Sequence, residues 1–543
     1  MSCRTTVVST LLIFWFFVTA VAAQKPTSGA APVPINVLTY HNDNGRTGLM
    51  QQETTLTLAN VNSATFGKLN FLTADGKVDA EPLYASNVVI NGIVHNVLYV
   101  VSENDSIYAF DADTGAQLWL KTALLPGETT SDGVNGCTQI NPIGITDTPV
   151  IDRLLNNHGV IYFVAMSKDA NGGYHQRLHA LDLTTGAELF GGPTEIQAKY
   201  PGTGDNSQNG FVIFDPKKYA ERVGLLEVNG KIHLGFTSHC DNRPYTAWVM
   251  QYSALTLQQL SVLNITPNGN SGGIWQSGAG LAADSDGYLY FCDGQGTFDT
   301  TLNAQGFPIN GDYGNGFMKL STSNGLAVAD YFEMYNTVSE TNNDLDLGSG
   351  GALVLPDISV SANKKVHLVV GAGKDGNIYI ADRDNMGKWN PNDNSNVYQQ
   401  LTGVLPNGEF AMPAYFHNTI YYGGLLNPIQ AYPIINGRLA TSPSSQTSTS
   451  FIYPGTTPSI SANLSQNGIL WAVQWQGTVG PGILYAYNAL DLTQELYDSN
   501  QSGFRDQWGP ATHFTAVMIA NGKVYVPSPT GVAVFGLLHS GRQ

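Results

Sequence analysis

Residues 108–119 read YAFDADTGAQLW, an apolar run, an acidic turn and a second apolar run that ends in tryptophan. The two aspartates allow two interpretations, a calcium loop or a hairpin turn. A calcium loop of the EF-hand type needs oxygen ligands at loop positions 5 and 12, but counting from Asp111 these are Gly115 and Thr122. Aspartate, which bonds its own backbone, and glycine, which accepts positive φ, are typical of a tight turn. We therefore predict a hairpin.

The same pattern of alternating apolar residues followed by a polar turn recurs along the chain. Further copies are HALDLTTGAELF (179–190), FMKLSTSNG (317–325), IYIADRDNMG (378–387) and LYAYNALDLTQELY (484–497). Two more short strands precede each copy, and a period of two residues is typical of strands. Repeats of roughly 40 to 60 residues are the spacing of propeller blades.

Eight such units can be counted from their first strands, which begin at Glu81, Asp147, Val223, Ser277, Gly350, Met412, Thr457 and Thr515. The last unit supplies three strands, and FGKLNFLT (66–73) is an unassigned strand ahead of the first unit. We predict an all-β fold, an eight-bladed β-propeller of four-stranded antiparallel blades, with the ring closed by this N-terminal strand. The predicted organisation is a signal peptide at 1–23, an extended lead-in at 24–60 and a single propeller at 61–543.

Composition restricts the partners and the compartment. The net charge of −17 and the pI near 4.9 argue against nucleic acid or an anionic membrane as a partner. Residues 1–23 combine an early arginine, an apolar run and small residues near the end, which is typical of a secretory signal. No later stretch is apolar for long enough to be a transmembrane segment. We expect a secreted, extracellular protein, or a periplasmic one if the host is bacterial.

Three cysteines remain after removal of the signal, so at most one intramolecular disulfide can form. Cys137 and Cys240 both lie in loops rich in Gly, Asn and Asp, whereas Cys292 continues the apolar strand LYFC. We expect a Cys137–Cys240 disulfide and a buried thiol at Cys292.

The opening motif resembles the repeat of the pyrroloquinoline quinone (PQQ) propellers, the quinoprotein alcohol dehydrogenase-like superfamily. The resemblance covers roughly residues 60–537 and is strongest in the first two units. Because the same repeat also builds propellers that are not enzymes, it identifies a scaffold and leaves the activity open.

The fifth unit carries the most specific part of the resemblance, in NDLDLGSGGALVLPD and VVGAGKDGNIYIADRD. The resemblance implies that Asp346 is the catalytic base and Lys374 contacts the quinone. By the same comparison Gln295, Asp241 or Asn242, together with Asp346, would be calcium ligands. The structural alternatives are a turn at Asp346 and a salt bridge from Lys374 to Asp346 or Asp375.

Other positions depart from the family pattern. No vicinal cysteine pair is present, and the aromatic residue expected beneath the quinone is replaced by Gly278 or Gly280. Trp275 stands slightly upstream, where it could stack on a quinone or a sugar, or pack between blades. No CxxCH motif is present, so we expect no haem and an external electron acceptor. His239 is a further polar candidate, but no second ligand at metal-binding spacing accompanies it.

Three functions remain open. The first is a quinoprotein-like oxidoreductase that acts on an alcohol or a sugar with PQQ and Ca²⁺. The second is a binding or scaffold propeller without catalysis that recognises a glycan or a protein partner. The third is a hydrolase or lyase that acts on extracellular polysaccharide.

Overall fold

The predicted hairpin at residues 108–119 is confirmed in the computed structural model. Strand β6 (Ser106–Asp111) pairs antiparallel with β7 (Gln117–Thr122). One carboxylate oxygen of Asp111 accepts hydrogen bonds from the backbone N–H groups of Thr114 at 2.7 Å and Asp113 at 3.1 Å, and Gly115 has a φ of 79°. The aspartates therefore hold a turn. The indole N–H of Trp119 donates to the carbonyl of Leu183 at 3.1 Å and so ties this hairpin to the next sheet.

The structure describes Met1, residues 34–133, Cys137 and residues 140–538. Except for Met1, the predicted signal peptide lies outside these residues. The chain divides into Met1–Pro34 and Ile35–Gln543, and all that follows concerns the second unit. Among the described residues, no helix is long and apolar enough to cross a membrane.

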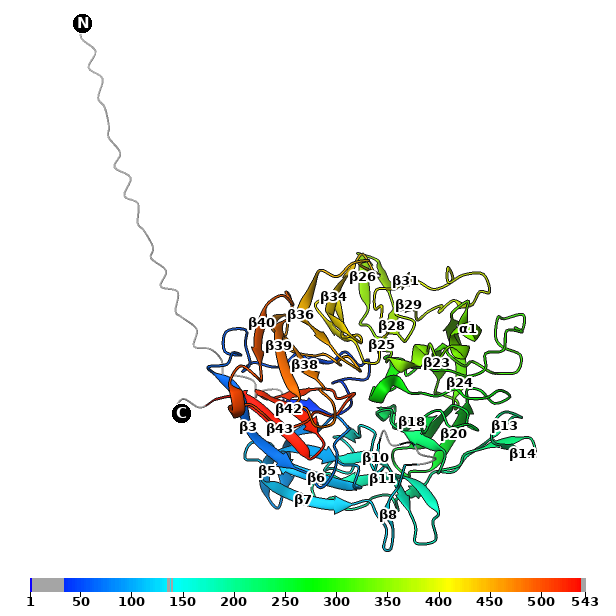
Figure 1. Ribbon diagram of the computed structural model, residues 1–543, viewed down its shortest axis with the longest axis horizontal. Helices are drawn as coiled ribbons and strands as arrows, with labels where there is room; N and C mark the ends of the chain where they lie inside the picture. Colours follow the sequence, from blue (N-terminus) through cyan, green and yellow to red (C-terminus); the bar gives the residue numbers. More distant parts are fainter. Residues whose placement is uncertain (2–33, 134–136, 138–139, 539–543) are drawn as a thin grey trace. The chain divides into compact units, whose positions relative to one another are not determined.

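The described residues form eight sheets of four or five strands, and two smaller sheets. Figure 1 shows the sheets in chain order. The first four larger sheets contain these strands: β1 (Asn36–Val37), β4 (Leu83–Ile90), β5 (Ile93–Val101), β6 and β7; β8 (Thr129–Thr130), β9 (Val150–Asp152), β10 (Val160–Lys168), β11 (Tyr174–Asp182) and β12 (Thr194–Glu195); β16 (Tyr219–Glu221), β17 (Leu226–Val228), β18 (Lys231–Ser238), β19 (Trp248–Ser253) and β20 (Gln259–Asn264); β21 (Ala282–Ala283), β22 (Leu289–Cys292), β23 (Phe317–Ser321), β24 (Ala327–Glu333) and β30 (Lys388–Trp389).

The other four larger sheets contain these strands: β25 (Leu353–Val354), β28 (Leu368–Ala372), β29 (Ile378–Asp382) and β31 (Gln399–Leu401); β32 (Ala414–Phe416), β33 (Thr419–Tyr422), β34 (Asn427–Ile435), β35 (Arg438–Leu439) and β36 (Ser445–Phe451); β2 (Leu49–Met50), β37 (Ser459–Asn463), β38 (Gln466–Gln474), β39 (Ile483–Asn488) and β40 (Glu495–Asp498); β3 (Phe66–Thr73), β41 (Met518–Ala520), β42 (Lys523–Ser528) and β43 (Gly531–Leu537). The remaining elements are β13 (Lys199–Pro201), β14 (Ser207–Gln208), β15 (Phe211–Ile213), β26 (Ile358–Ser361), β27 (Lys364–Val366), helix α1 (Thr337–Asn342) and the short 3₁₀ helices η2 (Gln276–Gly278), η3 (Leu347–Ser349) and η4 (Gly503–Arg505).

The last sheet joins the two ends of this unit. Strand β3 pairs antiparallel with β43 over its whole length, from Phe66 opposite Leu537 to Thr73 opposite Gly531. The apolar core follows the same order, since each buried cluster lies between successive sheets. One cluster contains Leu98, Trp471 and Met518 and so joins the first, seventh and eighth sheets.

Residues 36–53 run along the first strands of the sheets and are called the belt below. The sequence predicted this segment only as part of an extended lead-in. Backbone N–H groups donate to it in chain order: Ile151 to Leu38 at 2.8 Å, Ala283 to Asn44 at 2.7 Å, Val354 to Gly45 at 2.9 Å, Tyr415 to Thr47 at 2.9 Å and Ile460 to Gly48 at 2.7 Å. Strand β1 pairs with β4, and β2 pairs with β37. The belt therefore forms hydrogen bonds with sheets along the whole series of repeats. Its sequence does not alternate between apolar and polar residues, so it did not predict these contacts.

Arg46 is the buried centre of the belt. Its side chain is fully buried, and its guanidinium donates to the carbonyls of Leu281 at 2.7 Å, Tyr40 at 2.8 Å and Leu225 at 3.2 Å, and to the hydroxyl of Thr39 at 2.6 Å. One side chain thus links the belt to the third and fourth sheets.

Candidate functional site

Four of the predicted site residues line one cavity, with a volume of about 120 Å³. Asp346 immediately precedes η3, Trp275 immediately precedes η2, and Lys374 and Asp241 follow β28 and β18. The complete lining is Arg222, Cys240, Asp241, Trp275, Ser277, Asp346, Ser349, Lys374, Phe410, Tyr453 and Phe514. These residues come from loops at the ends of strands in different sheets, which is where propellers and other scaffolds carry function.

Asp346 and Lys374 form a close ion pair in this cavity. Lys374 Nζ lies 2.6 Å from Asp346 Oδ2, whereas Asp346 Oδ1 is buried and has no hydrogen-bond partner among the described residues. Burial raises the pKa of Asp346 to about 6, although Lys374 acts in the opposite direction. Burial also opposes the charge on Lys374, but the neighbouring Asp346 and Asp344 hold its pKa above the usual value. The salt bridge that the structural alternative predicts is therefore present, and it leaves one carboxylate oxygen free.

Gln295 and Asn242 do not line the cavity. The side-chain amide of Gln295 donates to Asp344 at 2.5 Å, and Asp344 also contacts Lys374 Nζ at 2.8 Å. Asp241 accepts a hydrogen bond from the Tyr245 hydroxyl at 3.0 Å, and burial raises the pKa of Asp241.

This arrangement does not fit calcium, which takes six to eight oxygen ligands. Within the part of the chain that the structure describes, no group of three or more His, Cys, Asp or Glu side chains is placed to hold a metal. The cation next to Asp346 is the ammonium group of Lys374.

The two glycines predicted at the missing aromatic position differ in their surroundings. A Cβ on Gly280 would lie 2.8 Å from Arg46, so the belt fills this space. A Cβ on Gly278 would meet only the carbonyl oxygens of Arg222 and Phe514, both at 3.9 Å, and Gly278 has a φ of 82°. Gly278 lines a neighbouring cavity together with Arg222 and Phe514, whereas Trp275 lines the cavity of Asp346.

Arg222 and three aromatic residues of this cavity, Phe410, Tyr453 and Phe514, were not among the predicted site residues. The Arg222 guanidinium carbon lies 5.2 Å from the ring centre of Phe514 and 6.0 Å from that of Trp275. Tyr453 lies 6.1 Å from Phe514 and 5.7 Å from Phe410, measured between ring centres. Position could have identified Arg222, since it stands directly before the predicted first strand of the third unit. The aromatic residues are separated by about forty to sixty positions, and only the fold brings them together.

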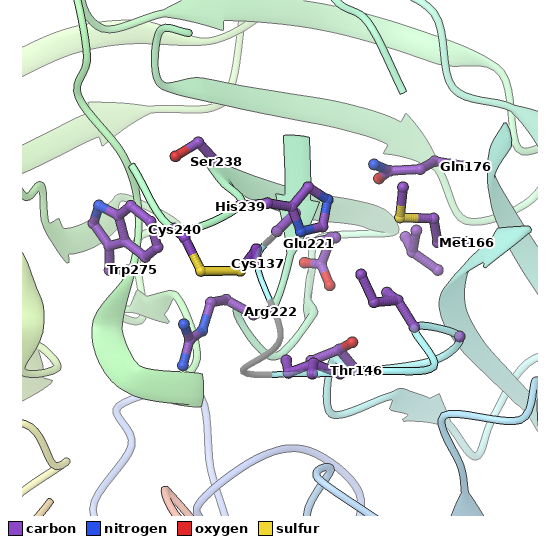
Figure 2. A pocket seen from close by; sticks show the side chains of 15 residues that line it. Cys137, Thr146, Met166, Gln176, Glu221, Arg222, Ser238, His239, Cys240 and Trp275 are labelled. Atoms are coloured by element: carbon purple, nitrogen blue, oxygen red, sulfur yellow. A yellow bond between two sulfur atoms is a disulfide. The ribbon is translucent and has the colours of Figure 1, made fainter. Parts of the chain in front are cut away.

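A second cavity adjoins the first, and Figure 2 shows its side chains. Arg222, Cys240 and Trp275 line both cavities, and His239 and Glu221 line only the second. Burial lowers the pKa of His239 to about 4, so its imidazole is neutral near pH 7. His239 contributes a neutral polar group to this wall.

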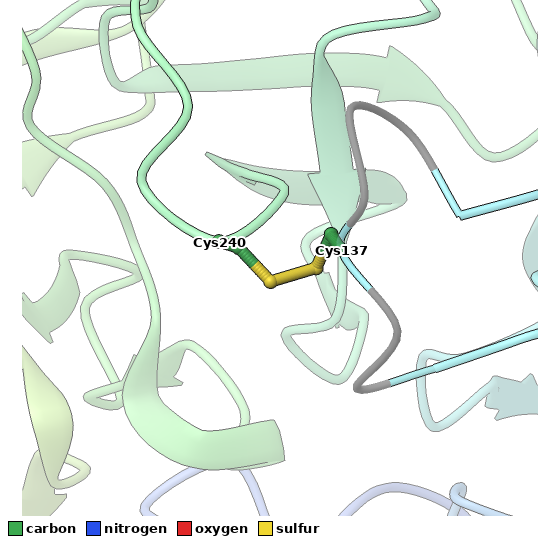
Figure 3. The surroundings of a disulfide bond; sticks show 2 residues. All are labelled: Cys137 and Cys240. Carbon is green, nitrogen blue, oxygen red and sulfur yellow. A yellow bond between two sulfur atoms is a disulfide. The ribbon is translucent and has the colours of Figure 1, made fainter.

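Cys137 and Cys240 form a disulfide (Figure 3). Both line the second cavity, and Cys240 also lines the first. Cys292 is a buried free thiol. Cys240 and Asp241 both have positive φ, 52° and 53°, so the chain next to the disulfide makes a sharp turn that directs Asp241 to the cavity.

Removal of this disulfide is expected to lower the free energy of unfolding by about 2 to 5 kcal/mol, because the cross-link joins residues far apart in sequence. The separation is 103 residues. Urea unfolding of the double variant C137S/C240S, compared with the oxidised wild type, measures the loss. Reductant should shift the wild-type midpoint and leave that of the double variant unchanged; equal stability of the two proteins would contradict the prediction.

Buried carboxyl groups are numerous, and they lead to a prediction about pH. Glu81, Asp147 and Glu409 are at most 3% exposed, and burial raises the pKa of each to about 8. In the unfolded chain such groups titrate near pH 4. Between about pH 4 and pH 8 the folded protein keeps protons that the unfolded chain releases, so the free energy of unfolding should fall as the pH rises.

We expect the protein to be at least about 3 kcal/mol less stable at pH 8 than at pH 5. Urea unfolding at both values measures the difference, and Glu409→Gln should make it smaller. A midpoint that is equal or higher at pH 8 would show that these carboxyl groups do not titrate as described.

Comparison with known proteins supports the fold. The chain matches no protein-family model and no curated protein. Solved structures do match: quinohemoprotein alcohol dehydrogenase from Comamonas testosteroni has a TM-score of 0.60 and 14% identity over 95% of this chain and 82% of its own. Quinohemoprotein alcohol dehydrogenase ADHIIG from Pseudomonas putida HK5 has a TM-score of 0.57 and 13% identity, over 93% of this chain and 81% of its own. A europium-containing methanol dehydrogenase has a TM-score of 0.61 and 12% identity, over 93% of this chain and 98% of its own.

At these identities the likeness concerns the fold alone. The resemblance predicted from the repeats is confirmed at that level, and the chain has the fold of the quinoprotein alcohol dehydrogenases.

Proposed function

We propose that this protein is a quinoprotein-like oxidoreductase that oxidises a hydroxyl group of a small-molecule alcohol or carbohydrate. The observation that carries the proposal is the Asp346–Lys374 pair in the cavity. Its two charged atoms are 2.6 Å apart, and the second carboxylate oxygen of Asp346 lacks a partner among the described residues. A perturbed carboxyl group in a cleft, next to a cation, is a common arrangement at catalytic sites.

Asp346 would act as the general base. With a pKa of about 6, most of its carboxyl group is ionised at neutral pH, and it is basic enough to accept a proton from a substrate hydroxyl. Lys374 holds one carboxylate oxygen, and the other has no hydrogen-bond partner among the described residues.

We propose that a flat quinone, and not a metal, binds in this cavity. Lys374 would contact the polar edge of such a group, and Trp275 would offer a ring face. When bound, PQQ would supply the acceptor for the two electrons and the hydrogen that leave the alcohol carbon.

We also propose that the eight larger sheets are the blades of one ring, closed by β3. The pairing of β3 with β43, the cluster that joins the first, seventh and eighth sheets, and the order of the belt contacts support this arrangement. We further propose that the protein is secreted, or periplasmic in a bacterial host. The predicted signal and the disulfide support this location, since structural disulfides persist in oxidising compartments.

Dye-linked oxidation of alcohols and sugars by purified protein with added PQQ tests the activity. Because Asp346 must be ionised to accept a proton, kcat/KM should rise with pH through about 6 and then level off. Assays with and without Ca²⁺ distinguish a metal requirement. No quinone binding at micromolar concentration, or a rate that is independent of pH between 5 and 7, would remove the proposal.

A binding propeller without catalysis is the second candidate. The aromatic side chains of Phe410, Tyr453 and Phe514 favour it, because they line the cavity and could stack on a sugar ring. Glycan binding that survives Asp346→Ala, without turnover of the glycan, would favour this function over oxidation. If the partner is a protein, its binding to this chain should not be reduced by competing glycans.

A further inference from the structure

Arg222 lies where three cavities meet. It lines the cavity of Asp346 and Lys374, the adjoining cavity of His239, and a third one that also contains Asp79 and His513. Among the described residues, the Arg222 side chain has no hydrogen bond and no ion pair within 4.0 Å, and its Nε atom is buried without a partner. A guanidinium group has five N–H donors, and the described residues accept from none of those on Arg222.

Among the described residues, no acidic side chain forms an ion pair with Arg222. Burial lowers its pKa, while Asp79, Glu103 and Asp241 act in the opposite direction from a distance. Each of these acids has another contact: Asp79 pairs with Lys77 at 2.8 Å, Asp241 accepts from Tyr245, and Glu103 accepts from the N–H of Gly144 at 2.8 Å. Leaving a buried donor unsatisfied costs stability, and an anion at this position would remove that cost.

The aromatic neighbours restrict the direction from which a ligand can approach. The guanidinium carbon is 5.2 Å from the ring centre of Phe514 and 6.0 Å from that of Trp275, within or at the limit of cation–π contact. Such contacts involve the ring faces and leave N–H groups available for bonds in the guanidinium plane. The forked N–H groups of arginine match the two oxygens of a carboxylate.

We propose that Arg222 binds the carboxylate of a small organic ligand, whose hydroxyl or carbonyl group then lies in the cavity of Asp346 and Lys374. The shared cavity supports this, because Arg222, Asp346 and Lys374 all line it. The carboxylate can come from two sources, a hydroxy acid substrate or a quinone that carries carboxylates. The inference rests on the proposed function only in placing the second group near Asp346.

Isothermal titration calorimetry of the full protein with matched probes tests whether Arg222 binds a carboxylate. Lactate and 1,2-propanediol share the carbon skeleton and the 2-hydroxyl, and differ in the carboxylate; PQQ is titrated separately. We expect lactate, PQQ or both to bind the wild type, and Arg222→Gln to weaken that binding at least about tenfold, as the loss of a charge-assisted bidentate contact implies. Arg222→Lys should recover only part of the affinity, because lysine keeps the positive charge but lacks the forked N–H groups of arginine.

Arg243→Gln is the matched control, since Arg243 is exposed and pairs with Asp205 away from the cavity. It should bind every probe as the wild type does. If Arg222→Gln folds poorly in thermal unfolding, the comparison of lactate with propanediol on the wild type still measures selectivity for the carboxylate, and Arg222→Lys then tests the arginine.

The results with the different probes distinguish the two sources of the carboxylate. Selective binding of lactate over the diol, lost in Arg222→Gln, assigns the carboxylate to the substrate; weaker PQQ binding in that variant, with lactate and diol alike, assigns it to the quinone. Unchanged binding of PQQ and lactate in Arg222→Gln, or binding of neither probe by the wild type, overturns the inference. Carboxylate binding without dye reduction would support the carboxylate site at Arg222 and contradict the proposed oxidoreductase. Oxidation of neutral alcohols that Arg222→Gln leaves unchanged would support the oxidoreductase and contradict the carboxylate site.

Discussion

Asp346→Asn is expected to lower the turnover of an alcohol substrate by about 100-fold to 10,000-fold, the usual contribution of a general base. Asparagine has the same shape as aspartate but cannot accept the hydroxyl proton. It also removes the negative charge 2.6 Å from Lys374 Nζ. The loss should appear in kcat and kcat/KM together, because the proton transfer belongs to the transition state. Steady-state dye reduction with PQQ present measures it.

A surface pair provides the control for Asp346→Asn. Asp357 and Lys365 form an Asp–Lys contact at 3.3 Å, are about half exposed, and lie outside the cavity. Asp357→Asn should retain wild-type turnover, since exposed pairs contribute little. If Asp346→Asn stays within a few-fold of the wild type while PQQ is bound, then Asp346 is a structural partner of Lys374 and not the base.

Arg46→Met is expected to lower the free energy of unfolding by about 3 to 5 kcal/mol, which is typical of removing one partner from a buried polar network. Methionine fills part of the volume but makes none of the hydrogen bonds to Leu281, Tyr40, Leu225 and Thr39. The carbonyls of the third and fourth sheets would then be buried without donors. Urea unfolding at fixed pH gives the difference in midpoint and slope.

Arg438→Met is the matched control for Arg46. Arg438 is exposed and donates only to the carbonyl of Tyr398 among the described residues. Its replacement should change stability by less than about 1 kcal/mol. A loss of similar size in both variants would mean that the belt does not stabilise the sheets through Arg46.

Most of the fold could be predicted because it depends on local patterns that repeat. The acidic turn at Asp111, the period of two residues and the unpaired strand at 66–73 each follow from short-range chemistry, and the hairpin and the β3–β43 pairing agree with them. Asp346, Lys374, Trp275 and Asp241 stand at strand ends, and they line one cavity. The repeat therefore also located a large part of the candidate site.

Three features depended on contacts between distant residues. The belt has no strand pattern of its own, because its carbonyls accept hydrogen bonds from many sheets in turn. Gln295 was expected to bind a metal, but it donates to Asp344, a contact that depends on how two loops meet. Arg222 stands next to Phe514 and Trp275, which lie 292 and 53 positions further along the chain, and no local pattern can encode that arrangement.

The sequence by itself determined the hairpin, its repetition and the strand order, because turn chemistry and alternation act between neighbouring residues. The tertiary structure decided what surrounds the Asp346 carboxylate. There the fold places Lys374 beside one oxygen, leaves the other without a partner among the described residues, and brings Arg222 to the same cavity. Those charges come from loops of different sheets, so their distances depend on how the sheets pack, and the chemistry of the site depends on those distances.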